Sequence, residues 1–147
     1  MSEDAENHPA LDLQLPAGGI VRGIGIDLIE TERIEGVWKR QQERFLNRVF
    51  TAGEQAYCLK MKNPVPHLAA RFAAKEAVSK AFTTGIGKRL GWKSIEVVKG
   101  EREQPLIRLD AQGQALLAAV GGSEVLVSLS HTAHYGQAVA VLVAKAP

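Results

Sequence analysis

Apolar positions along the first third of the chain change their spacing, from that of a strand to that of a helix. Ile20–Ile29 is rich in β-branched residues and predicts a strand. Gly23 and Gly25 interrupt it, as is typical of a strand that another backbone or a ligand approaches closely. From Thr31, a residue suited to the N-cap position, apolar side chains recur at helical spacing as far as Val49. This segment predicts one amphipathic helix.

The middle of the chain predicts two further helices. Thr51-Ala52-Gly53-Glu54 has the form of a capping box and begins a short helix that extends to Lys62. An alanine-rich helix follows over Pro66–Phe82, with Gly85 just beyond its end. Because alanine side chains let neighbouring backbones approach closely, we expect this second helix at the centre of the fold.

The C-terminal half of the chain predicts four strands and one helix. The strands are Ser94–Lys99, Leu106–Leu109, Glu124–Ser130 and Gln137–Lys145, and the helix is Asp110–Val120. The order of elements predicts an α+β fold, a small single domain in which an antiparallel sheet packs against helices. The last strand is apolar nearly throughout, so we expect both of its faces to be covered, by helices or by another subunit.

Length and composition favour one cytoplasmic domain. The 147 residues suit a single core, and 46% hydrophobic with 23% charged residues is ordinary for a globular protein. Residues 1–19 are polar and punctuated by proline and glycine, so we expect a flexible tail there and the domain over residues 20–147. The single cysteine, Cys58, suits a reducing compartment, and no apolar run has the length of a membrane span.

The net charge of +2 does not by itself indicate a nucleic-acid partner, but the charge is unevenly distributed. On the helix predicted from Thr31, four arginines and one valine follow one another at intervals of three or four. These residues are Arg33, Val37, Arg40, Arg44 and Arg48. Such a stripe repels itself unless an acidic partner lies on it. The alternative is a solvated helix face that Glu32, Glu35 and Glu43 partly balance.

Two carboxylates stand where packing alone would not place them. Asp27 ends a strand of apolar residues, and Glu76 shares one face of the alanine-rich helix with Lys80. If Asp27 and Glu76 converge, they form an all-oxygen site suited to Mg²⁺, completed by water and a substrate phosphate. Two structural alternatives are a helix cap made by Asp27 and an i,i+4 ion pair between Glu76 and Lys80, worth about 0.2–0.5 kcal/mol.

Three other features carry weaker signals. Gly85-Ile86-Gly87-Lys88-Arg89 has the backbone N–H groups and the cations that hold phosphate, although it lacks the Walker A pattern. His131 follows a strand, where it either contacts a ligand phosphate or closes a hairpin. Cys58 is expected to be a small buried hydrophobic residue rather than a nucleophile.

Taken in order, these segments resemble the holo-[acyl-carrier-protein] synthases, the small 4′-phosphopantetheinyl transferases, over about Val21–Lys145. The motifs that carry the resemblance are Gly23-Ile24-Gly25-Ile26-Asp27-Leu28-Ile29-Glu30, Arg48-Val49-Phe50-Thr51, Arg71-Phe72-Ala73-Ala74-Lys75-Glu76-Ala77 with Thr84-Gly85-Ile86-Gly87, and Ser128-Leu129-Ser130-His131-Thr132. The resemblance implies the 4′-phosphopantetheinyl transferase fold. It also implies transfer of phosphopantetheine from coenzyme A to a serine of apo-acyl carrier protein, a step in fatty acid biosynthesis that releases adenosine 3′,5′-bisphosphate.

The resemblance also implies roles for particular residues. Asp27 and Glu76 are the expected Mg²⁺ ligands in the catalytic centre, Glu76 is also the candidate base for the carrier serine, and Lys80 is expected to stabilise phosphate charge. The expected contacts to coenzyme A are Arg71, Lys80, Gly85, Gly87 and His131. The expected contacts to an acidic carrier protein are Arg33, Val37, Arg40, Arg44, Phe45 and Arg48. Members of the family form trimers with sites between subunits. Thr83 and Glu43 depart mildly from the family pattern.

Two other functions are consistent with the residues taken without the resemblance. One is a non-catalytic module that binds an acidic protein or nucleic acid through the arginine stripe, and its function would survive loss of Glu76. The other is a Mg²⁺-dependent hydrolase of nucleotide pyrophosphates, which would consume coenzyme A without a carrier protein. The transferase interpretation predicts neither a nucleic-acid partner nor a membrane partner.

Overall fold

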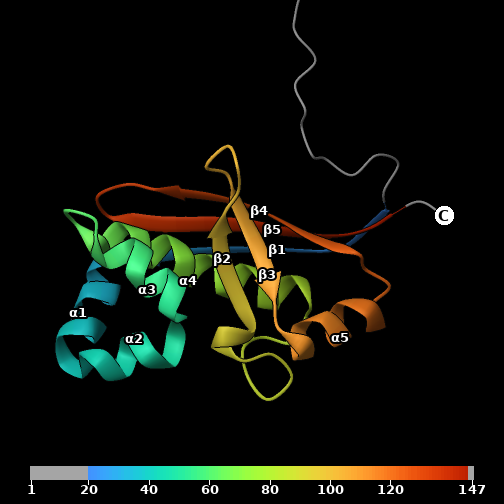
Figure 1. The fold of residues 1–147 in the computed structure, drawn as a ribbon, viewed down its shortest axis with the longest axis horizontal. Coiled ribbons are helices and arrows are strands. Elements are labelled where there is room, and N and C mark those ends of the chain that lie inside the picture. The colour runs from blue at the N-terminus through green and yellow to red at the C-terminus, as the bar shows by residue number, and fades with distance from the viewer. Residues whose placement is uncertain (1–19, 146–147) are drawn as a thin grey trace, which may run out of the picture.

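The computed structural model of the protein describes residues 20–145, so the predicted tail over residues 1–19 lies outside the described residues. The elements follow the predicted order closely (Figure 1). They are β1 (Ile20–Glu30), α1 (Thr31–Gln41), α2 (Glu43–Val49), α3 (Ala52–Leu59), α4 (Pro64–Ala81), the short 3-10 helix η2 (Trp92–Ser94), β2 (Ile95–Lys99), β3 (Pro105–Leu109), α5 (Ala111–Ala119), β4 (Glu124–His131) and β5 (Tyr135–Ala144). The predicted α+β class is confirmed.

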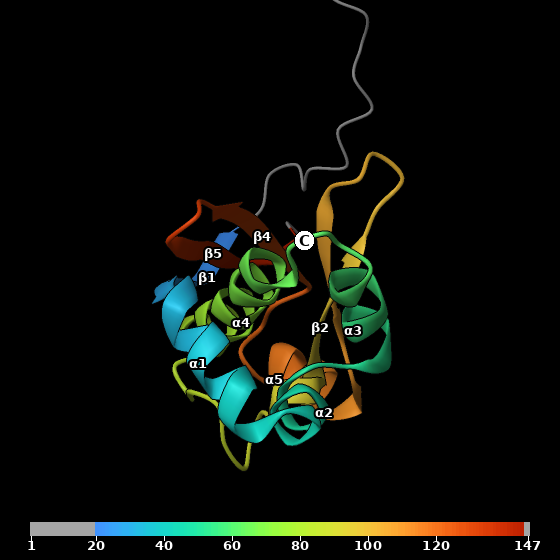
Figure 2. The same ribbon diagram turned by 90° about the vertical axis from the view of Figure 1, so that its left-hand side faces the viewer.

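The strands form two antiparallel sheets rather than one. β1, β5 and β4 make a three-stranded sheet in the order β1-β5-β4, and β2 pairs with β3 in a separate hairpin. Figures 1 and 2 show α4 lying along the larger sheet, with the remaining helices on the same side of it and the β2–β3 hairpin running past the sheet. The last strand of the chain, β5, is therefore the central strand of the sheet.

Small residues let α4 lie close against this sheet. Ala69, Ala73 and Ala77 of α4 are fully buried, and they share the core with Ala140 and Leu142 of β5. Because successive residues of a strand point to opposite faces, these β5 residues alternate with Val139 and Val141 on the other face. Among residues 20–145, no helix is long and apolar enough to cross a membrane.

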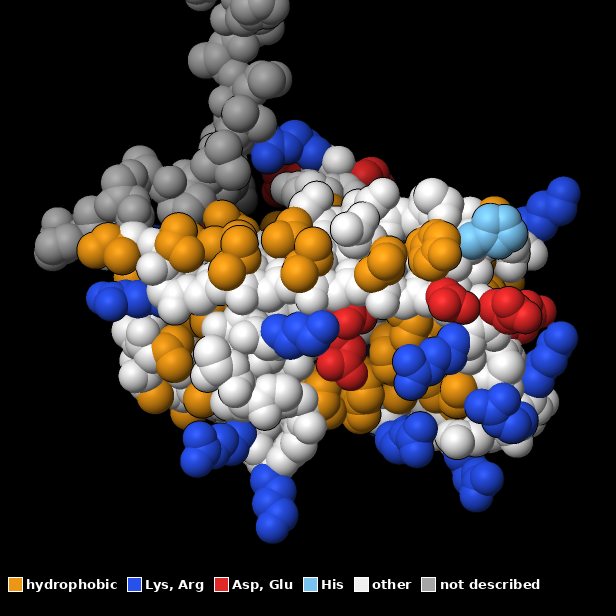
Figure 3. Space-filling model, turned by 180° about the vertical axis from the view of Figure 1, so that it is seen from behind, with side chains coloured by type: hydrophobic (Ala, Val, Ile, Leu, Met, Phe, Trp, Pro, Cys, Tyr) orange, Lys and Arg blue, Asp and Glu red, His pale blue; other side chains and the backbone are white. Residues whose placement is uncertain are grey.

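The opposite face of the larger sheet carries no helix of the described chain. There the side chains of Ile24, Ile26 and Leu28 are 67%, 58% and 59% exposed. Figure 3 shows a row of hydrophobic side chains along the upper part of the molecule on the β1 side. The expectation that both faces of the last strand are covered is therefore met on only one face within a single chain.

The single helix predicted from Thr31 to Val49 is wrong, because it divides at Gln42 into α1 and α2. Gln42 has φ 52° and ψ −129°, a backbone conformation that a helix cannot contain. The N-cap prediction is also wrong: Glu30 occupies that position, and the Thr31 hydroxyl donates to the Ala133 carbonyl at 2.7 Å instead. No break was predicted because glutamine carries no turn signal.

A buried ion pair ties α3 and α4 to the β2–β3 hairpin. The predicted capping box at Thr51 is confirmed, but its Glu54 carboxylate also accepts from the Val97 N–H and pairs with the Lys75 ammonium at 2.8 Å. Both side chains are fully buried. Lys75 also donates to the carbonyls of Trp92 and Ile95. The buried Lys75 ammonium is therefore fully paired inside the core.

Candidate functional site

Close contact between β1 and the C-terminal half of α4 positions the two predicted carboxylates. A Cβ atom on Gly23 would lie 2.2 Å from the Ala81 carbonyl oxygen, and one on Gly25 would lie 2.0 Å from the Ala77 carbonyl oxygen. Neither distance is compatible with a side chain. The two glycines therefore let the strand approach the helix backbone directly, as the sequence predicted, and this brings Asp27 beside the part of α4 that carries Glu76.

Asp27, Glu76 and Lys80 form one cluster between β1 and α4. The Lys80 ammonium lies 3.0 Å from the Asp27 carboxylate and 3.1 Å from the Ile26 carbonyl oxygen. The Asp27 side chain is 15% exposed and that of Lys80 is 50% exposed. The described structure thus pairs Lys80 with Asp27 rather than with Glu76, and Asp27 does not cap α1, whose N-cap makes no side-chain hydrogen bond. Both structural alternatives from the sequence are therefore wrong.

The electrostatics of Glu76 are unusual for a glutamate. Partial burial raises its pKa above the ordinary value, the Asp27 carboxylate raises it further, and the charges of Lys80 and Arg33 oppose the shift. Two carboxylates that repel each other in this way favour a cation between them. The described residues contain no cluster of three histidine, cysteine or acidic side chains that could hold a metal. A hard cation at this position would therefore take its remaining oxygen ligands from water and substrate.

Arg33 has a position that the sequence did not predict. It lies on α1, where it was expected only as a contact for a carrier protein, and yet its charge acts on Glu76. α1 therefore connects the arginine-bearing surface with the carboxylate cluster. A spacing pattern within one helix gives no signal for this proximity, because it depends on how α1 packs against α4.

A second group of predicted residues lines a basic pocket of about 270 Å³ on the other side of α4. Its lining residues are Tyr57, His67, Ala70, Arg71, Lys99, Pro105, Leu129 and His131, and we call this cavity the basic pocket. Arg71 and His131 were both predicted to contact coenzyme A. Tyr57, His67 and Lys99 were not predicted, since they come from three elements that only the tertiary fold brings together.

Arg71 is the most deeply buried cation of the basic pocket. Only 4% of the residue is exposed, and its guanidinium lies over the Tyr57 ring at 4.1 Å. One hydrogen bond, to the His67 carbonyl at 3.4 Å, is long, and the buried Nε has no partner. A buried guanidinium with unused donors is costly unless a ligand completes it, and phosphate oxygens fit its planar donors.

The glycine loop after α4 makes hydrogen bonds within the chain. The backbone N–H of Gly85 donates to the Ser79 carbonyl at 3.2 Å, and that of Gly87 donates to the Leu90 carbonyl at 3.0 Å. Both groups are used within the chain, and the expectation that the loop contacts coenzyme A stays a prediction. Gly85 instead supplies the positive φ of 66° with which the chain leaves the helix.

The predicted carrier-protein surface is altered in two respects. Arg33 and Arg40 lie on α1 and Arg44 and Arg48 on α2, so the exposed arginines are shared between two helices rather than aligned on one. Phe45 is 2% exposed and packs edge-on against Phe50 at 5.7 Å. The prediction that Phe45 contacts a partner is therefore wrong, because its ring belongs to the core. Val37 is half-buried.

Cys58 is excluded as a nucleophile by its surroundings. Its side chain is fully buried, and burial raises the pKa of the thiol to about 11. The prediction of a small buried hydrophobic residue is confirmed.

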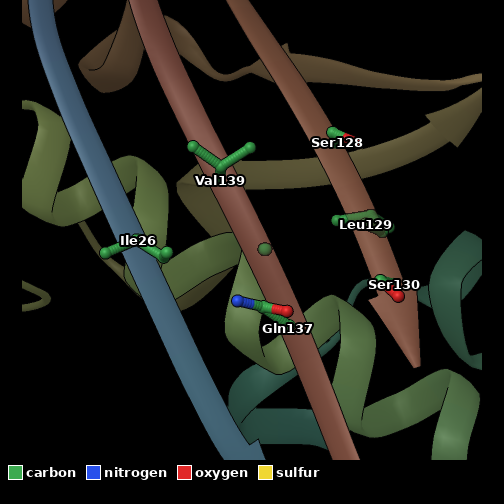
Figure 4. Close-up of a pocket in the computed structure, with 7 residues that line it drawn as sticks. Ile26, Ser128, Leu129, Ser130, Gln137 and Val139 are labelled. Atoms are coloured by element: carbon green, nitrogen blue, oxygen red, sulfur yellow. The ribbon is translucent and has the colours of Figure 1, made fainter. Parts of the chain in front are cut away.

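A hollow of about 260 Å³ lies on the uncovered face of the β1-β5-β4 sheet. Figure 4 shows its lining: Ile26 from β1, Gln137 and Val139 from β5, and Ser128 and Ser130 from β4. Apolar side chains and hydroxyl and amide groups therefore line this hollow together.

The fold and the carboxylate cluster define a class of transferase, and sequence comparison agrees. A family model described as the 4′-phosphopantetheinyl transferase superfamily matches residues 23–139. A holo-[acyl-carrier-protein] synthase of Chlamydia trachomatis serovar D is 47% identical over 119 residues, which are 81% of this chain and 97% of that protein. The chain belongs to the holo-[acyl-carrier-protein] synthase family, and the resemblance noted in the sequence is confirmed.

Solved structures agree with this assignment. The crystal structure of the Neisseria meningitidis holo-[acyl-carrier-protein] synthase is 30% identical and matches with a TM-score of 0.78 over 84% of this chain and 98% of that chain. The Helicobacter pylori enzyme, crystallised in complex with coenzyme A, is 36% identical and matches with a TM-score of 0.72 over 81% of this chain and 98% of that chain. The two likenesses confirm the predicted fold.

Proposed function

We propose that the chain transfers 4′-phosphopantetheine from coenzyme A to a serine of an apo-acyl carrier protein, giving holo-acyl carrier protein and adenosine 3′,5′-bisphosphate. The observation that carries this proposal is the convergence of Asp27, Glu76 and Lys80 between β1 and α4. Two carboxylates and an ammonium at one point suit a pyrophosphate and a hard cation together. The coenzyme A complex of the Helicobacter pylori relative supports the choice of donor.

Mg²⁺ fits the donor set, because Asp27 and Glu76 offer only carboxylate oxygens and Glu76 carries a raised pKa that a nearby cation would offset. Asp27 and Glu76 would hold this ion, which would supply positive charge beside the transferring phosphoryl group and the leaving group. Lys80 is half-exposed and within reach of the same point, so its ammonium stabilises charge on the phosphate oxygens.

The chemical step follows from these roles. The serine hydroxyl of the carrier attacks the phosphorus that bears pantetheine, and the bond from that phosphorus to the adenosine 3′,5′-bisphosphate oxygen breaks. Glu76 accepts the serine proton, directly or through one water, because its carboxylate lies beside the point where the phosphate is held. The electron pair of the broken bond stays on the bisphosphate, whose charge the nearby cations balance.

The basic pocket supplies the second half of the substrate site in this proposal. Arg71, Lys99 and His131 offer positive charge and donors to the phosphates of coenzyme A. The pocket and the carboxylates do not meet within one chain. Arg71 and Glu76 point about 140° apart around α4, and β5 lies between β1, which carries Asp27, and β4, which carries His131.

A trimer resolves this separation. The uncovered sheet face, with Ile24, Ile26 and Leu28 more than half exposed, is apolar enough to bury against another copy. We propose that three copies associate through this face, so that the basic pocket of one chain adjoins the carboxylates of its neighbour. A cyclic arrangement of this kind repeats one heterologous contact three times.

The arginines of α1 and α2 form the proposed docking surface for the carrier protein. Arg33, Arg40, Arg44 and Arg48 are all exposed, and Figure 3 shows basic side chains spread over the lower part of this face. An acidic carrier would be attracted to this surface. The proximity of Arg33 to Glu76 would then place the carrier serine near the base. A reducing cytoplasmic location suits the buried thiol of Cys58.

Intact mass spectrometry of an apo-acyl carrier protein tests the proposed function. We expect wild-type protein with coenzyme A and Mg²⁺ to add one phosphopantetheine to the carrier. The addition should be lost with Glu76→Gln and with a chelator. If the folded protein modifies none of several carriers, the transferase proposal fails; if it consumes coenzyme A without a carrier, the hydrolase alternative replaces it.

A further inference from the structure

Two imidazole rings meet in the basic pocket, and only one of them was predicted to have a function. His67, in the first turns of α4, lies edge-on to His131 at the end of β4, with ring centroids 5.0 Å apart. The other side of the His67 ring faces Tyr57 of α3 at 6.1 Å. Both histidines line the cavity, so a ligand that reaches His131 also reaches His67.

The ionisable side chains that face His67 are all basic. They come from Arg71 on α4, Lys99 on β2 and His131 on β4, while Lys60 at the end of α3 lies over the outer part of the Tyr57 ring at 5.1 Å. The residues that line the basic pocket include no aspartate or glutamate. Burial lowers the pKa of His67, and the charges of His131, Arg71 and Lys99 lower it further. In the ligand-free protein His67 is therefore neutral at physiological pH.

We propose that His67 is a further ligand-binding residue of the basic pocket, and that a phosphate group of coenzyme A recruits it by driving it to the imidazolium form. The inference rests on the proposed function, which places coenzyme A in this pocket. A phosphate dianion reverses the local electrostatics, because its negative charge outweighs each neighbouring cation. The imidazolium then gains a charge-assisted hydrogen bond that the neutral ring lacks.

Proton uptake is the measurable consequence. An opposite charge within about 4–6 Å raises a histidine pKa by roughly one to three, so His67 should take up about 0.5–1 proton when coenzyme A binds near pH 7. The monoester phosphate of coenzyme A, with a second pKa near 6, releases protons on entering a basic site. The contribution of His67 is therefore the difference between wild type and a variant in which position 67 cannot titrate.

His67→Phe is the suitable variant. Phenylalanine keeps a ring against Tyr57 and His131, and the hydrogen bond from Arg71 is unaffected because its acceptor is the backbone carbonyl of residue 67. His131→Phe is the matched control, since it removes the other imidazole from the same pocket. Coenzyme A is titrated calorimetrically into each protein at pH 7.2 in two buffers of different ionisation enthalpy, which gives the number of protons exchanged.

We expect wild type to take up at least about 0.5 proton more than His67→Phe. The variant should also bind coenzyme A about fivefold more weakly at pH 6.5, with a smaller deficit at pH 8. Proton exchange that is the same in wild type and His67→Phe, or that changes only in His131→Phe, overturns the inference while leaving the proposed function intact. If folded wild type does not bind coenzyme A, the proposed function fails and the inference falls with it.

Discussion

Replacing Gly25 with alanine should separate the strand that carries Asp27 from the helix that carries Glu76. The added Cβ would lie 2.0 Å from the Ala77 carbonyl oxygen and 2.7 Å from the Ala81 amide nitrogen. Because real Cβ contacts essentially never fall below 3.0 Å, β1 must move at least about 1 Å away from α4. Both opposing atoms belong to the helix backbone, so no side-chain rotation relieves the contact.

Two effects of different size follow from this displacement. Overpacking of a rigid interface costs about 1–3 kcal/mol. Because both close contacts are with backbone atoms, the cost here should fall at the upper end of that range. A loss of about 3 kcal/mol lowers the melting temperature of a domain of this size by roughly 10 °C. A shift of about 1 Å between Asp27 and Glu76 should reduce turnover on the order of 100-fold.

Gly91→Ala is the matched control for this substitution. Gly91 has φ −79°, which alanine adopts freely, and a Cβ there would lie 3.7 Å from the Ser94 hydroxyl oxygen. Its free energy of unfolding should change by less than about 0.5 kcal/mol. Thermal unfolding and carrier modification are measured for both variants. A Gly25→Ala protein that melts within about 2 °C of wild type and turns over normally would refute the argument from close packing.

Three further predictions concern other parts of the molecule. Glu76→Gln should raise the melting temperature of the ligand-free protein at about pH 7.5 while lowering turnover about 10²–10⁴-fold. Because the pKa of Glu76 is raised in the folded protein, ionisation of its carboxyl group destabilises the fold as the pH rises through that pKa. The gain in melting temperature of Glu76→Gln should therefore disappear in acid. A Glu76→Gln protein that is less stable than wild type at pH 7.5 would contradict this. Thr83→Gly should raise the free energy of unfolding, measured by urea titration, by about 1 kcal/mol, because a β-branched residue at φ 64° is strained. Gly85→Ala, at φ 66°, should lower the free energy of unfolding by a similar amount. Shifts in the same direction would rule out strain as the cause. Ile26→Lys should yield folded monomers in sedimentation, whereas Leu106→Lys, at a 43% exposed leucine away from the sheet face, should leave the assembly unchanged; an intact trimer with Ile26→Lys would place the contact elsewhere.

Local signals in the sequence were sufficient for most of the elements and for singling out the two carboxylates. The capping box at Thr51 and the glycines of β1 act through contacts close to their own positions, so their meaning can be predicted without the fold. Asp27 and Glu76 each stand out as a charge within an otherwise apolar or alanine-rich segment, but their convergence was only a condition in the residue-level argument, and their joint role came from the family resemblance.

Features that depend on how distant elements pack could not be predicted. Glu54 looked complete as a capping residue, and nothing near Lys75 indicates that the two form a buried pair across 21 residues of sequence. Phe45 was expected at the carrier surface only through the family resemblance, and its ring is 2% exposed and belongs to the core. Likewise, His67 and Lys99 reach the basic pocket only through the arrangement of α4 against the hairpin.

The central claim is that catalysis requires the carboxylates of one chain and the basic pocket of another. Glu76→Gln and Arg71→Gln chains are each expected to be nearly inactive at low coenzyme A. They are unfolded together, refolded as a mixture and assayed by the mass of the carrier protein. We predict recovery of about a quarter of the wild-type rate. In a randomly mixed cyclic trimer, about that fraction of interfaces combines Glu76 from an Arg71→Gln chain with Arg71 from the adjoining Glu76→Gln chain. A mixture as inactive as its components, beside wild type that survives the same refolding, would contradict the claim.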